Sequence, residues 1–306
     1  MKRVLVTGSN GLLGQKITQQ ILHHPEVELI ATNRGKNKYP VKEGYVYETM
    51  DILNQGQVAA VLHQYRPDVV IHTAAITNVD VCHTNRETCW ETNVDATANL
   101  ISLCEKMGIH FIYLSTDFVF DGLKGPYKED DAANPVSYYG ESKLAAENLT
   151  KQMKGSWTII RTILVYGILN DMSRSNIVLW AKGALQAAKP INVVNDQWRM
   201  PTLAEDLADA CLLAVKHSAT GVFHISGKDM MTVAELVKKV ADFWNLDTSL
   251  MKEISSDSLG QEAKRPKKTG FILDKAMTEL QYQPHSFEEG LALVSRQLSK
   301  GIETRN

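Results

Sequence analysis

The sequence predicts an α/β fold in which a doubly wound parallel sheet is joined to a smaller C-terminal lobe. Short apolar runs alternate with longer amphipathic stretches through the first half of the chain. These runs are rich in Val and Ile and nearly continuous, which is typical of strands buried on both faces. A glycine-rich turn directly follows the first run. Together the three observations favour a Rossmann-like arrangement.

The first half of the chain supplies the sheet and its covering helices. The apolar runs predict strands at 2–8, 27–32, 68–75, 109–116 and 157–162. The stretches between them predict helices at 12–24, 54–65, 86–107 and 137–153. Right-handed crossovers between parallel strands then place helices on both faces of the sheet.

The second half of the chain is less regular, and it predicts the smaller lobe. Helices are expected at 173–188, 203–217, 232–244 and 287–298. Shorter strands are expected at 191–195 and 221–226. The polar segment 252–270, basic at its end, is expected to be a loop.

Composition narrows the class of protein. The chain has 306 residues, 44% of them hydrophobic, and a net charge of −2. That balance gives no electrostatic field suited to nucleic acid or to an anionic membrane. The first apolar run is too short for a membrane span or a signal peptide, so a cytoplasmic protein is expected. The cysteines have no metal-ligand spacing and are expected to be reduced, buried thiols without a metal: Cys82, Cys89, Cys104 and Cys211.

Gly8, Gly11 and Gly14 lie between the first strand and the first helix. Glycine allows a positive φ in a tight turn, and it lets backbone N–H groups approach a pyrophosphate at the helix N-terminus. The third glycine allows the helix to pack closely on the strand. A ligand-free turn is the alternative, but the order strand, glycines, helix favours a dinucleotide.

The end of the second strand indicates which dinucleotide. NAD-binding folds usually place a carboxylate there for the ribose 2′-OH. Here Asn33 and Arg34 occupy the position, followed by Lys36 and Lys38. A guanidinium pairs with a 2′-phosphate, so the sequence favours NADP(H), with NAD(H) as the alternative. An ordinary solvated loop would equally contain such lysines.

Tyr139 and Lys143 are four residues apart, so on a helix they share one face. The preceding strand ends in Ser115 and Thr116. Catalytic groups of open α/β sheets gather at the carboxyl ends of strands. The pattern therefore predicts a site in which a phenol, an ammonium and a hydroxyl lie together.

These motifs resemble the extended short-chain dehydrogenase/reductase superfamily and, within it, the dTDP-4-dehydrorhamnose reductase family. The matching segments occur in order at 7–14, 50–54, 72–80, 91–101, 114–122, 138–143, 161–167, 195–202 and 265–274. The resemblance implies an NADP-binding domain over 1–165, and a mainly substrate-binding lobe over 166–306 that is interleaved with the last strands. It implies these cofactor contacts: Gly8, Asn10, Gly11, Leu12, Leu13, Gly14, Asn33, Arg34, Asp51, Ile52, Ala74, Ala75, Tyr139 and Lys143.

The resemblance also implies catalytic roles that fit the chemistry of ketone reduction. Tyr139 would donate a proton to the developing alkoxide, and Lys143 would lower the pKa of that phenol and reach the nicotinamide ribose. Thr116, or else Ser115, would position the carbonyl oxygen. Asn93 would hold a water that relays protons to Lys143. The alternatives are a buried structural tyrosine and an amide that only packs a helix.

Substrate contacts are expected at Ser115, Thr116, Leu164, Arg199 and Arg265. Leu164 stands where the family is expected to have a tryptophan. Arg199 is expected either to pair with a nucleotide diphosphate or to form a surface salt bridge with Asp196 or Glu205. Arg265, with Lys267 and Lys268, would meet a diphosphate or remain a solvated basic run.

The sequence thus predicts an NADPH-dependent reductase of a 4-keto nucleotide sugar, with dTDP-4-dehydro-L-rhamnose converted to dTDP-L-rhamnose. One alternative is an epimerase or dehydratase that recycles hydride on tightly held NAD. Another is a non-catalytic, NADP-binding regulatory subunit, such as the β subunit of methionine adenosyltransferase. A homodimer would accord with the family.

Overall fold

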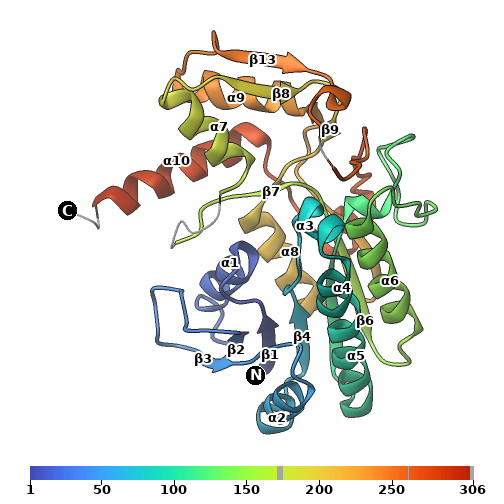
Figure 1. The fold of residues 1–306 in the computed structure, drawn as a ribbon. Coiled ribbons are helices and arrows are strands. Elements are labelled where there is room, and N and C mark those ends of the chain that lie inside the picture. The colour runs from blue at the N-terminus through green and yellow to red at the C-terminus, as the bar shows by residue number, and fades with distance from the viewer. Residues whose placement is uncertain (171–174, 261, 304–306) are drawn as a thin grey trace.

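The computed structural model describes residues 1–170, 175–260 and 262–303. Its centre is a seven-stranded parallel sheet in the order β11-β6-β5-β4-β1-β2-β3 (Figure 1). The strands are β1 Lys2–Thr7, β2 Val27–Asn33, β3 Val46–Thr49, β4 Val69–His72, β5 His110–Thr116, β6 Trp157–Thr162 and β11 Gly221–Ile225. The strand order reverses between β1 and β4, so a crevice opens at the carboxyl ends of these two strands. The predicted doubly wound sheet is confirmed.

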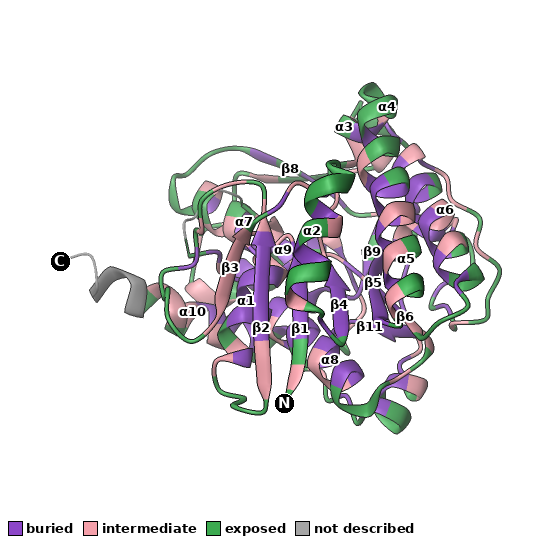
Figure 2. Cartoon of the chain, turned by 90° about the horizontal axis from the view of Figure 1, so that it is seen from below, coloured by how far each residue is buried: buried purple, intermediate pink, exposed green. Residues whose placement is uncertain are grey.

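Helices cover both faces of the sheet. One face carries α1 (Leu12–Ile21) and α8 (Ala204–His217); the other carries α2 (Gln55–Tyr65), α5 (Ala96–Met107) and α6 (Tyr138–Gln152). Val4 and Val6 pack toward the first group while Leu5 packs toward the second, because successive strand side chains alternate. Figure 2 shows β2, β4 and β5 largely buried between these layers.

A smaller lobe stands above the carboxyl edge of the sheet (Figure 1). It contains α7 (Ile177–Gln186), β8 (Ile191–Val194), α9 (Val233–Trp244), β13 (Met251–Ile254) and α10 (Phe287–Glu303). Its apolar core is separate from the two sheet cores. A capping box between Thr232 and Glu235 fixes the start of α9. Residues of the lobe itself therefore determine where this helix begins.

Short elements connect the lobe and the sheet. The β pairs are β7 (Val165–Tyr166) with β10 (Thr202–Leu203), and β9 (Trp198–Arg199) with β12 (Met231–Thr232). The remaining short helices are α3 Val79–Thr84, α4 Arg86–Trp90, η1 Glu91–Asp95, η2 Asp117–Val119, η3 Ser256–Ser258 and η4 Ala276–Leu280. No helix in the described ranges is long and apolar enough to cross a membrane.

The structure differs from the sequence prediction in several places. The helix expected at 86–107 is divided into α4, the π-helical turn η1 and α5. The segment expected to be a loop at 252–270 begins within β13, which pairs with β8. Strand β3 was not predicted. The helix expected from 173 begins at Ile177 with Asn176 as its N-cap, and 171–174 lie outside the described residues.

Candidate active site

A cavity of about 750 Å³ opens between the carboxyl edge of the sheet and the C-terminal lobe. Many of the residues singled out from the sequence line it: Gly8, Gly11, Leu12, Leu13, Gly14, Ala75, Ser115, Thr116, Tyr139, Lys143, Leu164, Arg199 and Arg265. Others lie outside this lining, although all fall within the described ranges: Asn10, Asn33, Arg34, Asp51, Ile52, Ala74 and Asn93. The fold therefore gathers the glycine turn, the strand ends and the lobe around one space.

The glycine turn forms a close-packed cradle at the start of α1. Gly8 has a φ of 72°, and a Cβ there would lie 2.8 Å from the Thr73 hydroxyl oxygen. A Cβ on Gly14 would collide with the carbonyl oxygen of Gly8. Gly11 is the N-cap of α1 and has no side-chain cap, so no capping side chain satisfies the first-turn backbone N–H groups, and the turn from Gly11 to Gly14 lines the cavity. This shape fits a pyrophosphate group.

Asn10 and Asn33 organise the loop after β2. Asn10 Nδ2 donates to the Lys36 carbonyl oxygen at 3.0 Å, and the Lys38 amide donates to Asn10 Oδ1 at 2.8 Å. Asn33 Oδ1 accepts from the Arg34 amide at 2.7 Å. These amides hold the segment in which Arg34 is exposed beside the glycine turn.

Asp51 and Ile52 lie between β3 and α2. Asp51 Oδ1 accepts a hydrogen bond from the Leu53 amide at 3.0 Å. Ile52 is buried in the sheet core. Ala74 is half-buried and packs against the edge of the same core. The hydrogen bond of Asp51 and the packing of Ile52 and Ala74 thus explain these residues by contacts within the protein.

Tyr139 and Thr116 meet at the inner end of the cavity. Tyr139 lies in the first turn of α6, which begins at the N-cap Ser137, whose Oγ accepts from the Gly140 amide at 3.2 Å. Thr116 lies close enough to Tyr139 for its side chain to lower the pKa of the phenol, and both residues line the cavity. The ring of Phe118 packs edge-on against Tyr139 with centroids 5.7 Å apart. The phenol and the hydroxyl therefore face the same point, as predicted.

Lys143 lies one turn further along α6. It is 3% exposed and lines the same cavity. Burial lowers the pKa of Lys143 to about 7, against the opposing charge of Glu147. Its ammonium therefore loses its proton far more easily than that of an exposed lysine.

The expected lowering of the Tyr139 pKa by Lys143 is wrong for this structure. Burial raises the pKa of Tyr139 above its ordinary value, the hydrogen bond with Thr116 opposes this rise, and the nearby charge of Asp117 adds to it. Burial is the largest cause of this rise, because desolvation disfavours the charged phenolate. The phenol is held in its protonated form, which is the form able to act as an acid.

Ser115 is turned toward a buried ion pair that the sequence analysis missed. Its hydroxyl donates to Glu147 Oε1 at 2.6 Å, and Arg161 Nη2 donates to Glu147 Oε2 at 2.7 Å. Glu147 has no exposure at all and follows Lys143 by one turn on the same helix face. The four-residue spacing from Lys143 to Glu147 is the sequence signal that could have identified this buried carboxylate. Thr116 is thus better placed than Ser115 to meet a substrate.

The Asn93 side chain is held by the backbone of Ile76. Asn93 Oδ1 accepts from the Ile76 amide at 2.8 Å, and Nδ2 donates to the Ile76 carbonyl oxygen at 3.0 Å. Its Nδ2 also lies 3.1 Å from Ser142 Oγ. The side chain thus matches the alternative of an amide that packs a helix, here within the π-helical turn η1.

All the cysteines are free and buried, as expected. Cys82 and Cys89 pack beside Tyr139. No cluster of His, Cys, Asp or Glu that could hold a metal ion occurs among the described residues.

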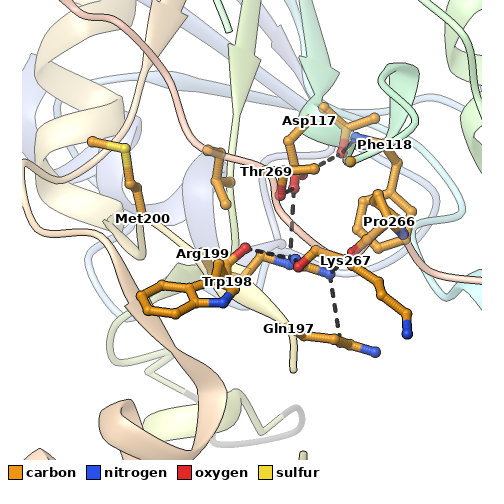
Figure 3. A network of polar contacts seen from close by, with 12 residues as sticks. Asp117, Phe118, Gln197, Trp198, Arg199, Met200, Pro266, Lys267 and Thr269 are labelled. Atoms are coloured by element: carbon orange, nitrogen blue, oxygen red, sulfur yellow. Dashed lines mark hydrogen bonds and ion pairs between the residues drawn. The ribbon is translucent and has the colours of Figure 1, made fainter. Parts of the chain in front are cut away.

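Arg199 and Arg265 line the cavity from the side of the lobe. Arg199 is 4% exposed, and its Nε lies 4.0 Å from Asp117 Oδ2 (Figure 3). The expected surface salt bridge to Asp196 or Glu205 is wrong, because Lys267 pairs with Asp196 and Lys16 pairs with Glu205.

Arg265 is mostly buried rather than part of a solvated run. Its Nη2 lies 2.7 Å from Asp80 Oδ2 in α3, and Arg265 itself lines the cavity. Leu164 has a φ of 41° and lines the same wall. Trp180 on α7 and Asp117 also line the cavity but were not predicted; Asp117 directly follows the strand end that carries Thr116.

Comparison with known proteins decides the family. The model described as the RmlD substrate binding domain matches residues 1–300. The chain belongs to this family. A dTDP-4-dehydrorhamnose reductase from Clostridium acetobutylicum superposes with a TM-score of 0.84 at 29% identity, covering 97% of this chain and 99% of that one. The family resemblance drawn from the sequence motifs is therefore confirmed.

Two further relatives of this chain are a second reductase and a subunit of methionine adenosyltransferase. The Bacillus anthracis dTDP-4-dehydrorhamnose reductase, solved in complex with NADP, has a TM-score of 0.82 at 28% identity, covering 97% of this chain and 100% of that chain. The bovine (Bos taurus) methionine adenosyltransferase 2 subunit beta is 31% identical over 271 residues, which is 87% of this chain and 79% of the relative.

Proposed function

We propose that this protein is an NADPH-dependent reductase of a 4-keto nucleotide sugar, with dTDP-4-dehydro-L-rhamnose as its substrate and dTDP-L-rhamnose as its product. The observation that carries the proposal is the single cavity in which the glycine cradle, Thr116, Tyr139 and Lys143 come together. A dinucleotide site and a proton donor in one space are what the reduction of a carbonyl requires.

The residues present fit a nicotinamide dinucleotide. Gly8, Gly11 and Gly14 line the cavity where α1 begins, and the turn is so close-packed that a Cβ on Gly8 or Gly14 would collide with protein backbone. Arg34 is exposed in the loop that Asn10 holds, which supports a preference for the 2′-phosphate of NADPH. When bound, the reduced nicotinamide supplies hydride to the carbonyl carbon.

Side chains of the protein bind the carbonyl oxygen of the substrate and supply the proton. Thr116 and Tyr139 present hydroxyl groups that hydrogen-bond the carbonyl oxygen, and Tyr139 gives its proton to the developing alkoxide. Lys143 lies one helical turn away on the same face, where its ammonium would hold the nicotinamide ribose of the bound coenzyme. Glu147 compensates the Lys143 charge, and Arg161 in turn compensates Glu147.

The lobe supports a nucleotide-linked substrate. Beyond the catalytic groups the cavity continues between α7 and β8, where Asn176, Trp180 and Asn192 line it. Aromatic and amide side chains of this kind suit a base and a ribose. Arg265 adds a cation at the rim beside Asp80.

The test is NADPH consumption with dTDP-4-dehydro-L-rhamnose, beside other 4-keto nucleotide sugars and a blank without sugar. The proposal expects turnover with this substrate and formation of dTDP-L-rhamnose. Background rates across the whole panel would contradict it. Purification with tightly bound NAD, together with epimerisation of a nucleotide sugar, would replace it with the epimerase alternative.

A regulatory subunit is the second candidate, and one observation favours it. The relative that is 31% identical is named as a subunit of methionine adenosyltransferase. The test is co-purification with such an enzyme and a change in its activity on adding this protein. A stable complex combined with no reductase activity would favour this candidate over the first.

A further inference from the structure

Arg199 is a buried cation whose terminal N–H groups are all directed at protein atoms. Nη1 lies 2.7 Å from the Trp198 carbonyl oxygen and 3.3 Å from that of Lys267. Nη2 lies 2.8 Å from the Pro266 carbonyl oxygen and 3.4 Å from Gln197 Oε1. Guanidinium has five N–H donors and no acceptor. These contacts therefore occupy four of them (Figure 3).

The remaining donor, Nε, faces the corner beside the catalytic groups. It lies 4.0 Å from Asp117 Oδ2, and both side chains are almost fully buried. Asp117 Oδ1 accepts from the Thr116 hydroxyl at 3.1 Å. The guanidinium also lies over the Phe118 ring, 5.9 Å from its centroid, and that ring packs against Tyr139. Arg199 thus reaches both catalytic side chains through one intermediate residue each.

Two of the carbonyl groups that Arg199 binds, those of Pro266 and Lys267, belong to residues 266–269, here called the wall segment. The Trp198 amide donates to the Lys267 carbonyl oxygen at 2.7 Å, and the Thr269 amide donates to the Trp198 carbonyl oxygen at 3.2 Å. The Thr269 hydroxyl also donates to Asp117 Oδ2. This wall segment directly follows Arg265, which lines the cavity and pairs with Asp80.

We infer that Arg199 is a positioning residue that fastens the wall segment to the Asp117–Phe118 corner, and that it is not a ligand for a substrate phosphate. Binding a phosphate would require Arg199 to release carbonyl groups that are shielded from water, and an unpaired buried acceptor costs free energy. Asp117 would lose the cation that compensates its buried charge. The kinetic part of this inference rests on the proposed reductase function.

The decisive variant is Arg199→Met, with Arg3→Met as the matched control. Arg3 forms an exposed ion pair with Glu28 at the amino end of β1, far from the cavity. We expect Arg199→Met to lower kcat by about 10²-fold, as misplaced catalytic groups do, and to leave the dissociation constant of dTDP unchanged. Arg3→Met should change neither quantity. Weaker dTDP binding with kcat retained would overturn the inference.

Asp117→Asn tests the link to the catalytic corner. In Arg199→Met the Asp117 carboxylate is left without its cation, and Asn removes that charge. The double variant should therefore lose less kcat than the product of the two single losses, because the residues act as one unit. Independent, multiplicative losses would contradict the link.

A readout without catalysis separates this inference from the proposed function. Amide hydrogen exchange over 267–270 should be faster in Arg199→Met than in the wild type or in Arg3→Met. Arg199→Lys keeps the charge with fewer donors, so it should show intermediate exchange, and it serves where the Met variant does not fold. Unchanged exchange in both Arg199 variants would overturn the inference even if the protein reduces no keto sugar.

Discussion

The Nζ atom of Lys143 lies 2.7 Å from the carbonyl oxygen of Leu114 and donates a hydrogen bond to it. Lys143 belongs to α6 and Leu114 to β5, so this bond joins the helix that carries Tyr139 to the strand that ends in Thr116. The same ammonium lies 4.1 Å from the centroid of the Tyr113 ring. Tyr139 and Thr116 are therefore held in register by a buried cation.

The charge of Lys143 predicts how activity depends on pH. Burial lowers its pKa to about 7, so the ammonium is present below that pH and is lost above it. We expect kcat/KM for NADPH to fall as pH rises beyond about 7. In Lys143→Arg the cation persists, so this decline should disappear even if the rate is lower. A wild-type profile that stays level from about pH 6 to 9 would contradict the role of this charge.

Lys143 also predicts how stability depends on pH. Because the folded pKa is depressed, the buried charge destabilises the protein most below about pH 7. Stability then rises toward the ordinary lysine pKa, where the unfolded chain still holds the proton. Lys143→Met should raise Tm by about 2–4 °C for each kcal/mol recovered, and more at low than at high pH. A lower Tm for this variant at every pH would contradict the account.

Arg34 predicts the choice of coenzyme. Its guanidinium is the group available for a 2′-phosphate, and a charge-assisted bond of this kind is worth about 1.5–3 kcal/mol. Arg34→Ala should weaken NADPH binding about tenfold or more, and it should leave NADH binding unchanged. Lys239→Ala, an exposed cation on α9, is the control. Equal losses for both coenzymes in Arg34→Ala would remove this role.

The Arg161–Glu147 ion pair predicts which substitution beside the site reduces the free energy of unfolding most. Its atoms are 2.7 Å apart, with side chains 2% and 0% exposed. Arg161→Met leaves the Glu147 carboxylate buried without its main partner, so it should cost about 3–5 kcal/mol in the free energy of unfolding. Lys151→Met, which removes the half-exposed partner of the same carboxylate, should cost about 1 kcal/mol or less. Equal costs in urea unfolding would contradict this ranking.

The same pair predicts sensitivity to acid. Burial alone would raise the pKa of Glu147, but the hydrogen bonds and charge of Arg161, with the Ser115 hydroxyl, hold it below its usual range. A depressed carboxyl pKa stabilises the fold above the ordinary carboxyl range and loses that contribution as pH falls. Arg161→Met should therefore flatten the loss of stability in acid.

The sequence predicted those parts of the site that depend on residues close together in the chain. The glycines at 8, 11 and 14 indicate a tight turn between strand and helix, because a Cβ on Gly8 or Gly14 would collide with backbone atoms. Tyr139 and Lys143 share a face because both lie on one helix. The apolar runs identified β1, β2, β4, β5 and β6, whereas the half-exposed β3 and β13 have no such run.

Contacts between distant segments could not be predicted from the sequence. Nothing near Arg199 in the chain indicates that Asp117 and the carbonyl groups of Pro266 and Lys267 would enclose it. Nothing near Asn93 indicates that Ile76 would hold its amide. The pKa of Tyr139 was misjudged for the same reason, because burial is a property of the whole fold.

The central claim is that Tyr139 supplies the proton in ketone reduction at this cavity. The most direct measurement is the rate of NADPH oxidation by dTDP-4-dehydro-L-rhamnose in Tyr139→Phe, with NADPH affinity measured on the same preparation. The account predicts that kcat falls by about 10²-fold or more while NADPH still binds, since only the hydroxyl is removed. A rate near that of the wild type, with coenzyme bound, would contradict it.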